Sequence, residues 1–157
     1  MSTLHYLTVQ DFLWMSFELT EEIQSFNFAK LEEAVFTQYS YGSSHDLAKQ
    51  AARLLKEFRR MKPFAKGNEA MAFLGTAAFL ELNGYDINLE GPGALTWVRR
   101  VWDLPEAAAE EISSRMKETH AHHHGVDTTK DIMIGLFARY GDTLKSLLAE
   151  EPAKALA

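Results

Sequence analysis

Residues 61–85 read MKPFAKGNEAMAFLGTAAFLELNGY, a turn that contains proline and glycine and leads into a long apolar segment. Pro63 cannot continue a preceding helix, because its ring blocks the backbone and its nitrogen carries no hydrogen. It also pushes the preceding residue, Lys62, toward an extended conformation. Residues 68–82 are apolar nearly all the way round a helix, and a helix with so little polar face belongs in the middle of a bundle. Asn83 and Gly84 end it, since glycine readily takes the left-handed conformation that terminates helices. The stretch therefore predicts a buried central helix.

The rest of the chain is predicted to form helices around this centre. Apolar spacing and capping residues predict helices beginning at Thr8, over 28–36, from Ser44 to about Met61, and over 94–102, 106–123 and 128–149. Residues 38–44 are rich in turn formers and permit a small hairpin, and residues 85–89 are predicted to be an extended link. Gly75 would let a neighbouring helix approach the central helix closely. We expect one all-α domain over residues 1–157, with no internal repeat.

Composition narrows the class of protein. An apolar fraction of 46% and a charged fraction of 24% are ordinary for a globular domain, and there is no cysteine for a disulfide or a thiolate metal site. The net charge of −6 makes DNA or RNA an unexpected partner, because nucleic-acid binders usually have a basic balance. No apolar run is long and uncharged enough to cross a bilayer, and we expect a cytoplasmic protein without a membrane partner.

The loop before the central helix resembles the active-site loop of the Fic/Doc family. The family loop reads approximately His-Pro-Phe-x-(Asp/Glu)-Gly-Asn-(Gly/Lys)-Arg, and Pro63, Phe64, Gly67 and Asn68 match it. This family transfers nucleotidyl or phosphoryl groups from nucleotides to protein hydroxyls. The resemblance implies a Fic/Doc-like helical bundle around the buried central helix.

Two further segments are similar to the same family. Residues 6–11, YLTVQD, resemble the opening of its Doc-like branch, and residues 79–85, FLELNGY, resemble the end of its central helix. The resemblance thus covers about residues 6–130, and residues 131–157 lie beyond it. It also implies that the turn at residues 39–44 takes the place of the flap that holds a target segment by strand-like pairing, with a plain surface loop as the equal alternative.

The positions that carry the family's chemistry hold other residues here. The resemblance implies a general base at the motif histidine, where this chain has Lys62, and an ordinary lysine is almost fully protonated at neutral pH. Lys66 replaces the acidic residue that holds magnesium, and an ammonium group cannot ligate a hard cation. Ala70 replaces the arginine that clamps phosphate oxygens. We therefore expect no metal site in the loop and a chain that is not an efficient enzyme.

The backbone of the loop keeps one possible function. Gly67 and Asn68 lie where a helix N-terminus leaves N–H groups that attract anions, and Lys66 could pair with a phosphate. Asn68 could also cap the helix while exposing its amide. These three residues are the predicted anion- or nucleotide-binding site, with weak binding of ATP or another nucleotide as the only cofactor. Glu69 would oppose it, and in the plainer interpretation Gly67 and Asn68 only begin a core helix.

A histidine cluster offers a separate hypothesis. His120 and His124 would lie on one face if the predicted helix continued, and this i, i+4 spacing occurs in two-histidine zinc sites. His122 and His123 lie between them. The alternative is a polar helix end, where protonated histidine is favoured by the helix dipole.

The leading hypothesis is a Fic/Doc-fold protein with a degenerate loop that binds a protein partner, either antitoxin-like or a target, or a phosphate-like anion. The first alternative is an active nucleotidyl- or phosphotransferase of unusual mechanism, toxin-like, which uses Lys62 or Lys66. The second is a helical protein that binds metal through the histidine cluster.

Overall fold

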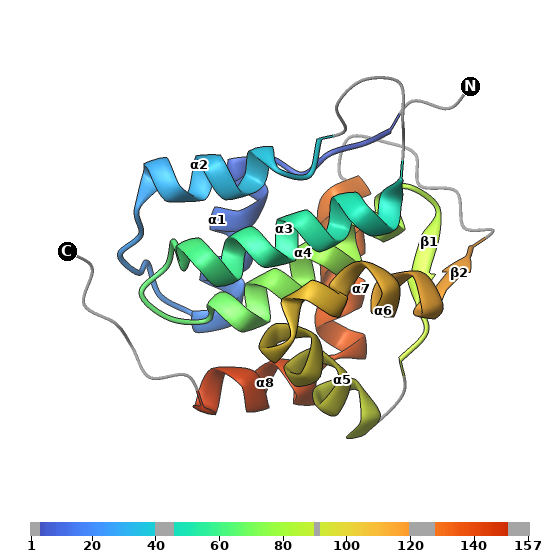
Figure 1. The fold of residues 1–157 in the computed structure, drawn as a ribbon. Coiled ribbons are helices and arrows are strands. Elements are labelled where there is room, and N and C mark those ends of the chain that lie inside the picture. The colour runs from blue at the N-terminus through green and yellow to red at the C-terminus, as the bar shows by residue number, and fades with distance from the viewer. Residues whose placement is uncertain (1–3, 40–45, 90–91, 120–127, 151–157) are drawn as a thin grey trace.

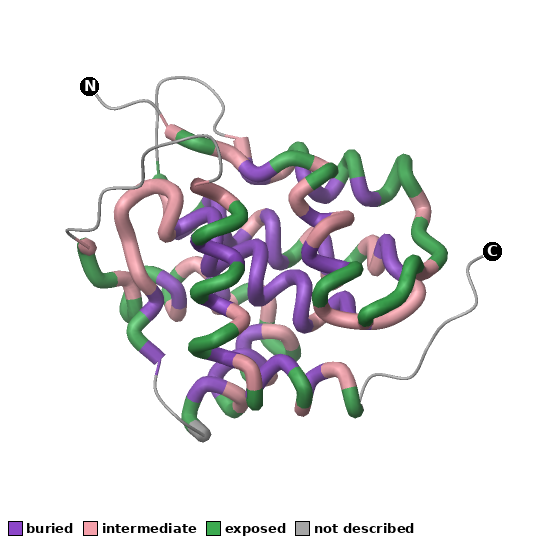
Figure 2. The backbone as a smooth tube through the Cα atoms, turned by 180° about the vertical axis from the view of Figure 1, so that it is seen from behind, coloured by how far each residue is buried: buried purple, intermediate pink, exposed green. Residues whose placement is uncertain are grey.

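The structure is a computed structural model that describes residues 4–39, 46–89, 92–119 and 128–150. Helix α4 (Asn68–Leu82) lies at the centre of its fold. Every residue from 70 to 80 is buried, and Figure 2 shows this helix as a continuous buried segment in the middle of the chain. Helices α1, α3, α7 and α8 and strand β1 all contact it. The predicted central helix is confirmed, with both of its ends as expected.

The other elements complete a mostly helical chain (Figure 1). In chain order they are α1 (Val9–Thr20), α2 (Phe28–Phe36), α3 (Leu47–Met61), β1 (Tyr85–Ile87), α5 (Pro92–Asp103), the 3-10 helix η1 (Pro105–Ala107), α6 (Ala108–Arg115), β2 (Met116–Glu118), α7 (Thr128–Arg139) and α8 (Gly141–Glu150). Strands β1 and β2 pair antiparallel, with Asp86 opposite Lys117. The all-α class is confirmed, while the specific Fic/Doc arrangement stays a prediction.

Side-chain caps fix where α1 and α3 begin. Thr8 and Asp11 form a capping box at the predicted start of α1, each side chain accepting from the other residue's backbone N–H. Helix α3 begins later than expected, because Asp46 rather than Ser44 is its N-cap and accepts from the Lys49 N–H at 3.2 Å. Residues 40–45, which include the predicted hairpin, lie outside the described residues.

Two predicted helices are shorter than the sequence indicates. The helix expected over 106–123 ends at Arg115, because residues 116–118 pair with β1 and take their backbone hydrogen bonds from it. The helix expected over 128–149 is bent between α7 and α8 at Tyr140. Tyr140 turns inward there, packs edge-on against Phe73 and is 4% exposed. Burying this ring accounts for the bend.

Helix α1 approaches α4 closely at Gly75, as the sequence predicts. A Cβ atom added to Gly75 would lie 2.6 Å from Cε1 and 2.7 Å from Cζ of Phe12. The Phe12 ring is fully buried and packs on Phe58, with 4.8 Å between ring centroids, so it has no free space to move into. Glycine is therefore required at this helix crossing.

A matched pair of glycine substitutions tests this crossing. Gly75→Ala should lower the free energy of unfolding by about 1–3 kcal/mol, because the new methyl group overpacks the core. Gly135→Ala should raise it by about 0.5–1 kcal/mol, because Gly135 lies in α7 with nothing within 4 Å of the added Cβ and alanine favours helix. Urea unfolding measures both. Equal effects of the two changes would contradict the close crossing.

Tyr140, the buried residue between α7 and α8, makes the stability of the fold depend on pH. Its hydroxyl donates to the Ile87 carbonyl at 3.1 Å, and burial raises the pKa of Tyr140 although the neighbouring Arg139 guanidinium lowers it. The folded state holds this proton more tightly than the unfolded chain. The contribution of Tyr140 to the free energy of unfolding should therefore be fully present below about pH 10, the ordinary tyrosine pKa, and should be lost as the pH rises further. In Tyr140→Phe, the decrease in stability at alkaline pH should be smaller than in the wild-type chain. Unfolding midpoints of both proteins across alkaline pH provide the measurement.

Candidate functional site

The loop of residues 62–67 is held by the linker of residues 21–27, which joins α1 to α2. The Asn27 N–H donates to the Pro63 carbonyl at 2.8 Å, and the Ala65 N–H donates to the Ser25 carbonyl at 3.1 Å. These two bonds make an antiparallel bridge in which Phe26 faces Phe64. The Phe64 side chain is fully buried, so the bridge anchors the loop to the core.

Asn68 closes the loop from its other end. Its Oδ1 accepts from the Phe64 N–H at 3.1 Å, and its Nδ2 donates to the Phe64 carbonyl at 2.8 Å. The residue is fully buried, and the N-cap of α4 is Gly67 rather than Asn68. The prediction that Asn68 caps the helix is thus wrong, because its carboxamide is used to hold the backbone of Phe64.

Lys66 is paired within the protein. Its side-chain Nζ forms an ion pair with Glu22, and its backbone N–H donates to Oε1 of Gln24 at 2.9 Å. Gln24 in turn donates from Nε2 to the Ser16 hydroxyl at 2.7 Å. The linker therefore supplies both a carboxylate and an amide to the residue expected to bind phosphate. An anion would have to compete with Glu22 for the Lys66 ammonium.

Gly67 takes the left-handed conformation, with φ of +81°. A Cβ atom at this position would lie 3.1 Å from Cδ2 of Leu148 in α8, so an apolar side chain packs on the glycine. Gly67 has no side chain to cap the helix, and its carbonyl accepts from the Met71 N–H at 2.9 Å. The structure thus brings Lys66, Gly67 and Asn68 together, and anion binding by them stays a prediction.

Lys62, in the loop, and Ala70, in α4, both have structural roles. Lys62 ends α3 in a left-handed conformation, with φ of +43°, and its N–H donates to the Phe58 carbonyl at 2.9 Å. Its expected extended conformation is therefore wrong, because the residue serves as the helix C-cap. Ala70, at the place of the family's phosphate-clamping arginine, is fully buried. A methyl group within the core cannot contact a phosphate.

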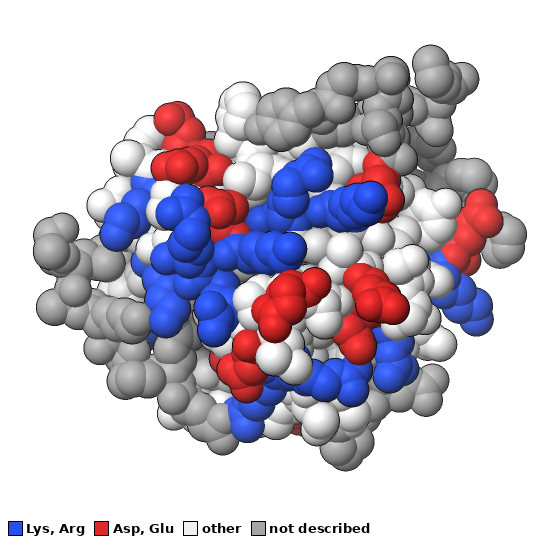
Figure 3. Space-filling model, in the orientation of Figure 1, with Lys and Arg blue, Asp and Glu red and all other residues white. Residues whose placement is uncertain are grey.

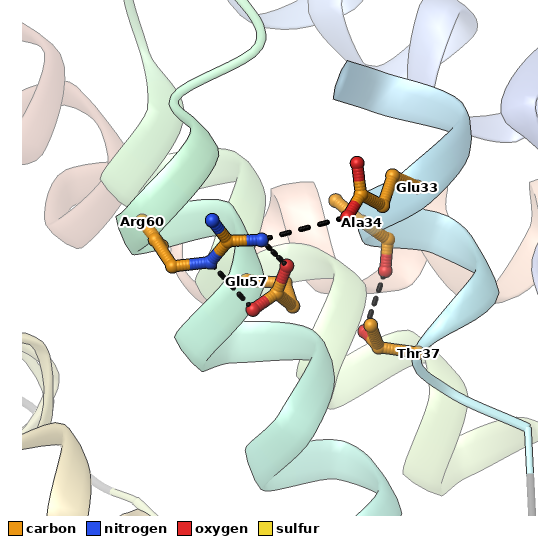
Figure 4. A network of polar contacts seen from close by, with 5 residues as sticks. All are labelled: Glu33, Ala34, Thr37, Glu57 and Arg60. Atoms are coloured by element: carbon orange, nitrogen blue, oxygen red, sulfur yellow. Dashed lines mark hydrogen bonds and ion pairs between the residues drawn. The ribbon is translucent and has the colours of Figure 1, made fainter. Parts of the chain in front are cut away.

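Basic side chains gather over α3 and the adjoining loop (Figure 3), and several already have carboxylate or carbonyl partners. Arg60 donates to both oxygens of Glu57, at 2.9 and 2.6 Å, and lies 3.6 Å from Glu33 of α2 (Figure 4). The hydrogen bond with Glu57 is the main cause of the raised pKa of Arg60. Arg59 donates to the Trp102 carbonyl. Arg60 and Arg59 thus link α3 to α2 and to α5, respectively.

The metal hypothesis finds no site among the described residues. No group of three or more His, Cys, Asp or Glu side chains there could hold an ion. The cluster of His120, His122, His123 and His124 lies outside the described residues. The helix that would have placed His120 and His124 on one face already ends at Arg115.

An apolar surface beside the loop is the feature that sequence reasoning missed. We define the linker surface as the exposed side chains of Phe17, Ile23 and Phe26, which are 48%, 91% and 37% exposed. All three line one pocket of about 190 Å³ together with Phe64. The only sequence signal is that the segment from Phe12 to Ile23 is more apolar than one buried helix face requires.

Comparisons with protein-family models, with curated proteins and with solved structures find no match. None of the helices in the described residues is long and apolar enough to span a membrane.

The pairing of Lys66 leads to a prediction about anion binding. Phosphate should bind weakly and in a salt-sensitive way, because it must compete with Glu22 for the Lys66 ammonium and the Asn68 residue at the start of α4 is buried. Lys66→Glu should abolish binding, and Glu22→Gln should strengthen it by releasing the ammonium. Lys130→Glu, an exposed charge reversal in α7, serves as the control. NMR titration of the Gly67 and Asn68 amide resonances gives the measurement. Resonances that do not move would leave the loop as a helix start only.

Proposed function

We propose that this chain is a non-catalytic cytoplasmic relative of the Fic/Doc family that binds a protein partner through the linker surface. The observation that carries the proposal is the contiguity of Phe17, Ile23 and Phe26, which are exposed and line the same pocket. Exposed apolar side chains scattered singly are normal, whereas contiguous ones mark interaction sites. Five of the seven large apolar side chains exposed in the described residues fall between residues 17 and 36.

The position of this surface relates it to the loop. Phe26 pairs with Phe64 through the backbone bridge, and the ring centroids of the two residues are 5.9 Å apart. Glu22, which pairs with Lys66, lines the same pocket. A partner seated on the linker surface would therefore contact the region that carries chemistry in the family that this chain resembles.

The state of the loop supports a non-catalytic role. Lys62 is at a helix C-cap, Lys66 is neutralised by Glu22, and Ala70 is inside the core. None of the three offers the base, the metal carboxylate or the phosphate clamp that the resemblance would require. Removing a well-placed base alone typically costs about 10²–10⁴-fold in rate.

Incubation with labelled ATP, magnesium and candidate target proteins tests the lack of catalysis. Labelling should stay at background for the wild-type chain and should not change in Lys62→Ala, because neither has a usable base. Robust magnesium-dependent labelling that disappears in Lys62→Ala would overturn the non-catalytic reading and favour the transferase alternative.

Binding is tested by placing a photo-crosslinking amino acid at Ile23, identifying the crosslinked protein from the native cell, and titrating that purified protein by calorimetry. Ile23→Ser should weaken binding at least about tenfold, since burying an isoleucine contributes about 1.5–3 kcal/mol. Ile134→Ser is the matched control, because Ile134 is 56% exposed on α7, outside the linker surface. Binding that is equally sensitive to both changes, or to neither, would contradict the proposed surface.

A further inference from the structure

We infer that the partner segment taken by the linker surface is cationic as well as apolar: an apolar side chain enters the pocket while neighbouring Lys or Arg side chains meet Glu18 and Glu21. This inference rests on the proposed function and names the chemistry of the partner at the same site. It is carried by the pocket lining, by the internal bonds of its polar residues and by the charge of α1 and the linker.

The pocket beside the linker is lined mostly by apolar side chains. It lies between the end of α1 and the linker, and apolar side chains supply five of its eight lining residues: Leu13, Phe17, Ile23, Phe26 and Phe64. Its volume of about 190 Å³ is small, and it suits an apolar side chain rather than a whole small-molecule ligand, whose sites usually exceed about 300 Å³.

The polar residues of the pocket already have partners inside the protein. Ser16 and Gln24 bond to each other at 2.7 Å, and Gln24 also accepts from the Lys66 N–H. Glu22 is paired with the Lys66 ammonium. A polar group entering the pocket would displace these bonds, whereas an apolar group would leave them in place. The pocket therefore selects an apolar anchor.

The segment of chain that carries most of the pocket lining, α1 and the linker, is acidic. Residues 9–29 contain four carboxylates and no lysine or arginine. Asp11 belongs to the capping box at the far end of α1, and Glu22 is neutralised by Lys66. Glu18 and Glu21 remain, and both are exposed: Glu18 directly follows Phe17, and Glu21 lies two residues before Ile23. Charges of one sign at the rim of an interface favour partners of the opposite sign and speed their association.

This charge distribution disfavours the other occupants. Nucleic acid and acidic proteins would be repelled by Glu18 and Glu21. A second copy would meet the surface through a two-fold contact, which places each subunit's own patch against its copy and so brings like charges together. The chain's net charge of −6 acts in the same direction. A basic, apolar segment of a different protein remains as the occupant.

Selection from a random-sequence phage-displayed peptide library tests the inference with the intact chain as bait. Peptides that bind wild type and fail to bind Ile23→Ser should be enriched at least about threefold in Lys and Arg beside Leu or an aromatic residue, relative to the unselected library. Synthetic versions should bind more weakly as salt rises. Glu18→Lys/Glu21→Lys bait should remove that enrichment, while Glu110→Lys, an exposed reversal in α6, should retain it. Circular dichroism confirms that each bait is folded.

The outcomes separate the two proposals. Peptides that require Ile23 but show no Lys or Arg enrichment, or an acidic one, would overturn the cationic partner and leave the linker surface as a protein-binding site. Failure to select any peptide that distinguishes wild type from Ile23→Ser would overturn both. Enrichment that persists in the Glu18→Lys/Glu21→Lys bait would also overturn the role of these two carboxylates.

Discussion

The constraint on which the structure depends is that α4 has no polar face. Every side of this helix must be covered, so α1, α3, α7 and α8 are placed around it rather than beside one another in a layer. The covering is close enough at Gly75 that a methyl group would overlap the Phe12 ring. Because the loop of residues 62–67 leads directly into α4, its position is set by the same covering. The candidate site is thus built at the start of a helix that its neighbours enclose.

Three carboxamide side chains perform the same task at different places. Asn68 bonds to both the N–H and the carbonyl of Phe64, Gln38 does so with Leu7, and Asn83 does so with His5. Each carboxamide pairs with the N–H and the carbonyl of one residue that lies outside the helices and the two-stranded sheet, as a neighbouring strand would. At Leu7 and Phe64 this meets the demand that buried backbone groups be hydrogen-bonded, whereas the His5 pair lies at the surface.

Local features of the fold are predictable from the sequence, and contacts between distant segments are not. Both ends of α4 follow from Pro63, Gly84 and the apolar residues between them, and the α1 cap follows from Thr8. The ion pair between Glu22 and Lys66 joins residues with no local relation, so no spacing rule could find it. The bend at Tyr140 likewise arises from packing on Phe73. Where tertiary contacts compete with local propensity, the sequence pattern alone predicts a helix that is too long.

The bond pair between Asn68 and Phe64 has a consequence for how this loop could change over time. It closes the backbone of residues 64–68 through the Asn68 carboxamide. Shape and chemistry are therefore specified by different residues. Mutations can accumulate at the outward positions, adding or removing charge, while the path of the chain stays constant. Such a loop can lose one activity and acquire another without an unfolded intermediate, and substitutions that install new reactive groups there would start from a backbone already in place.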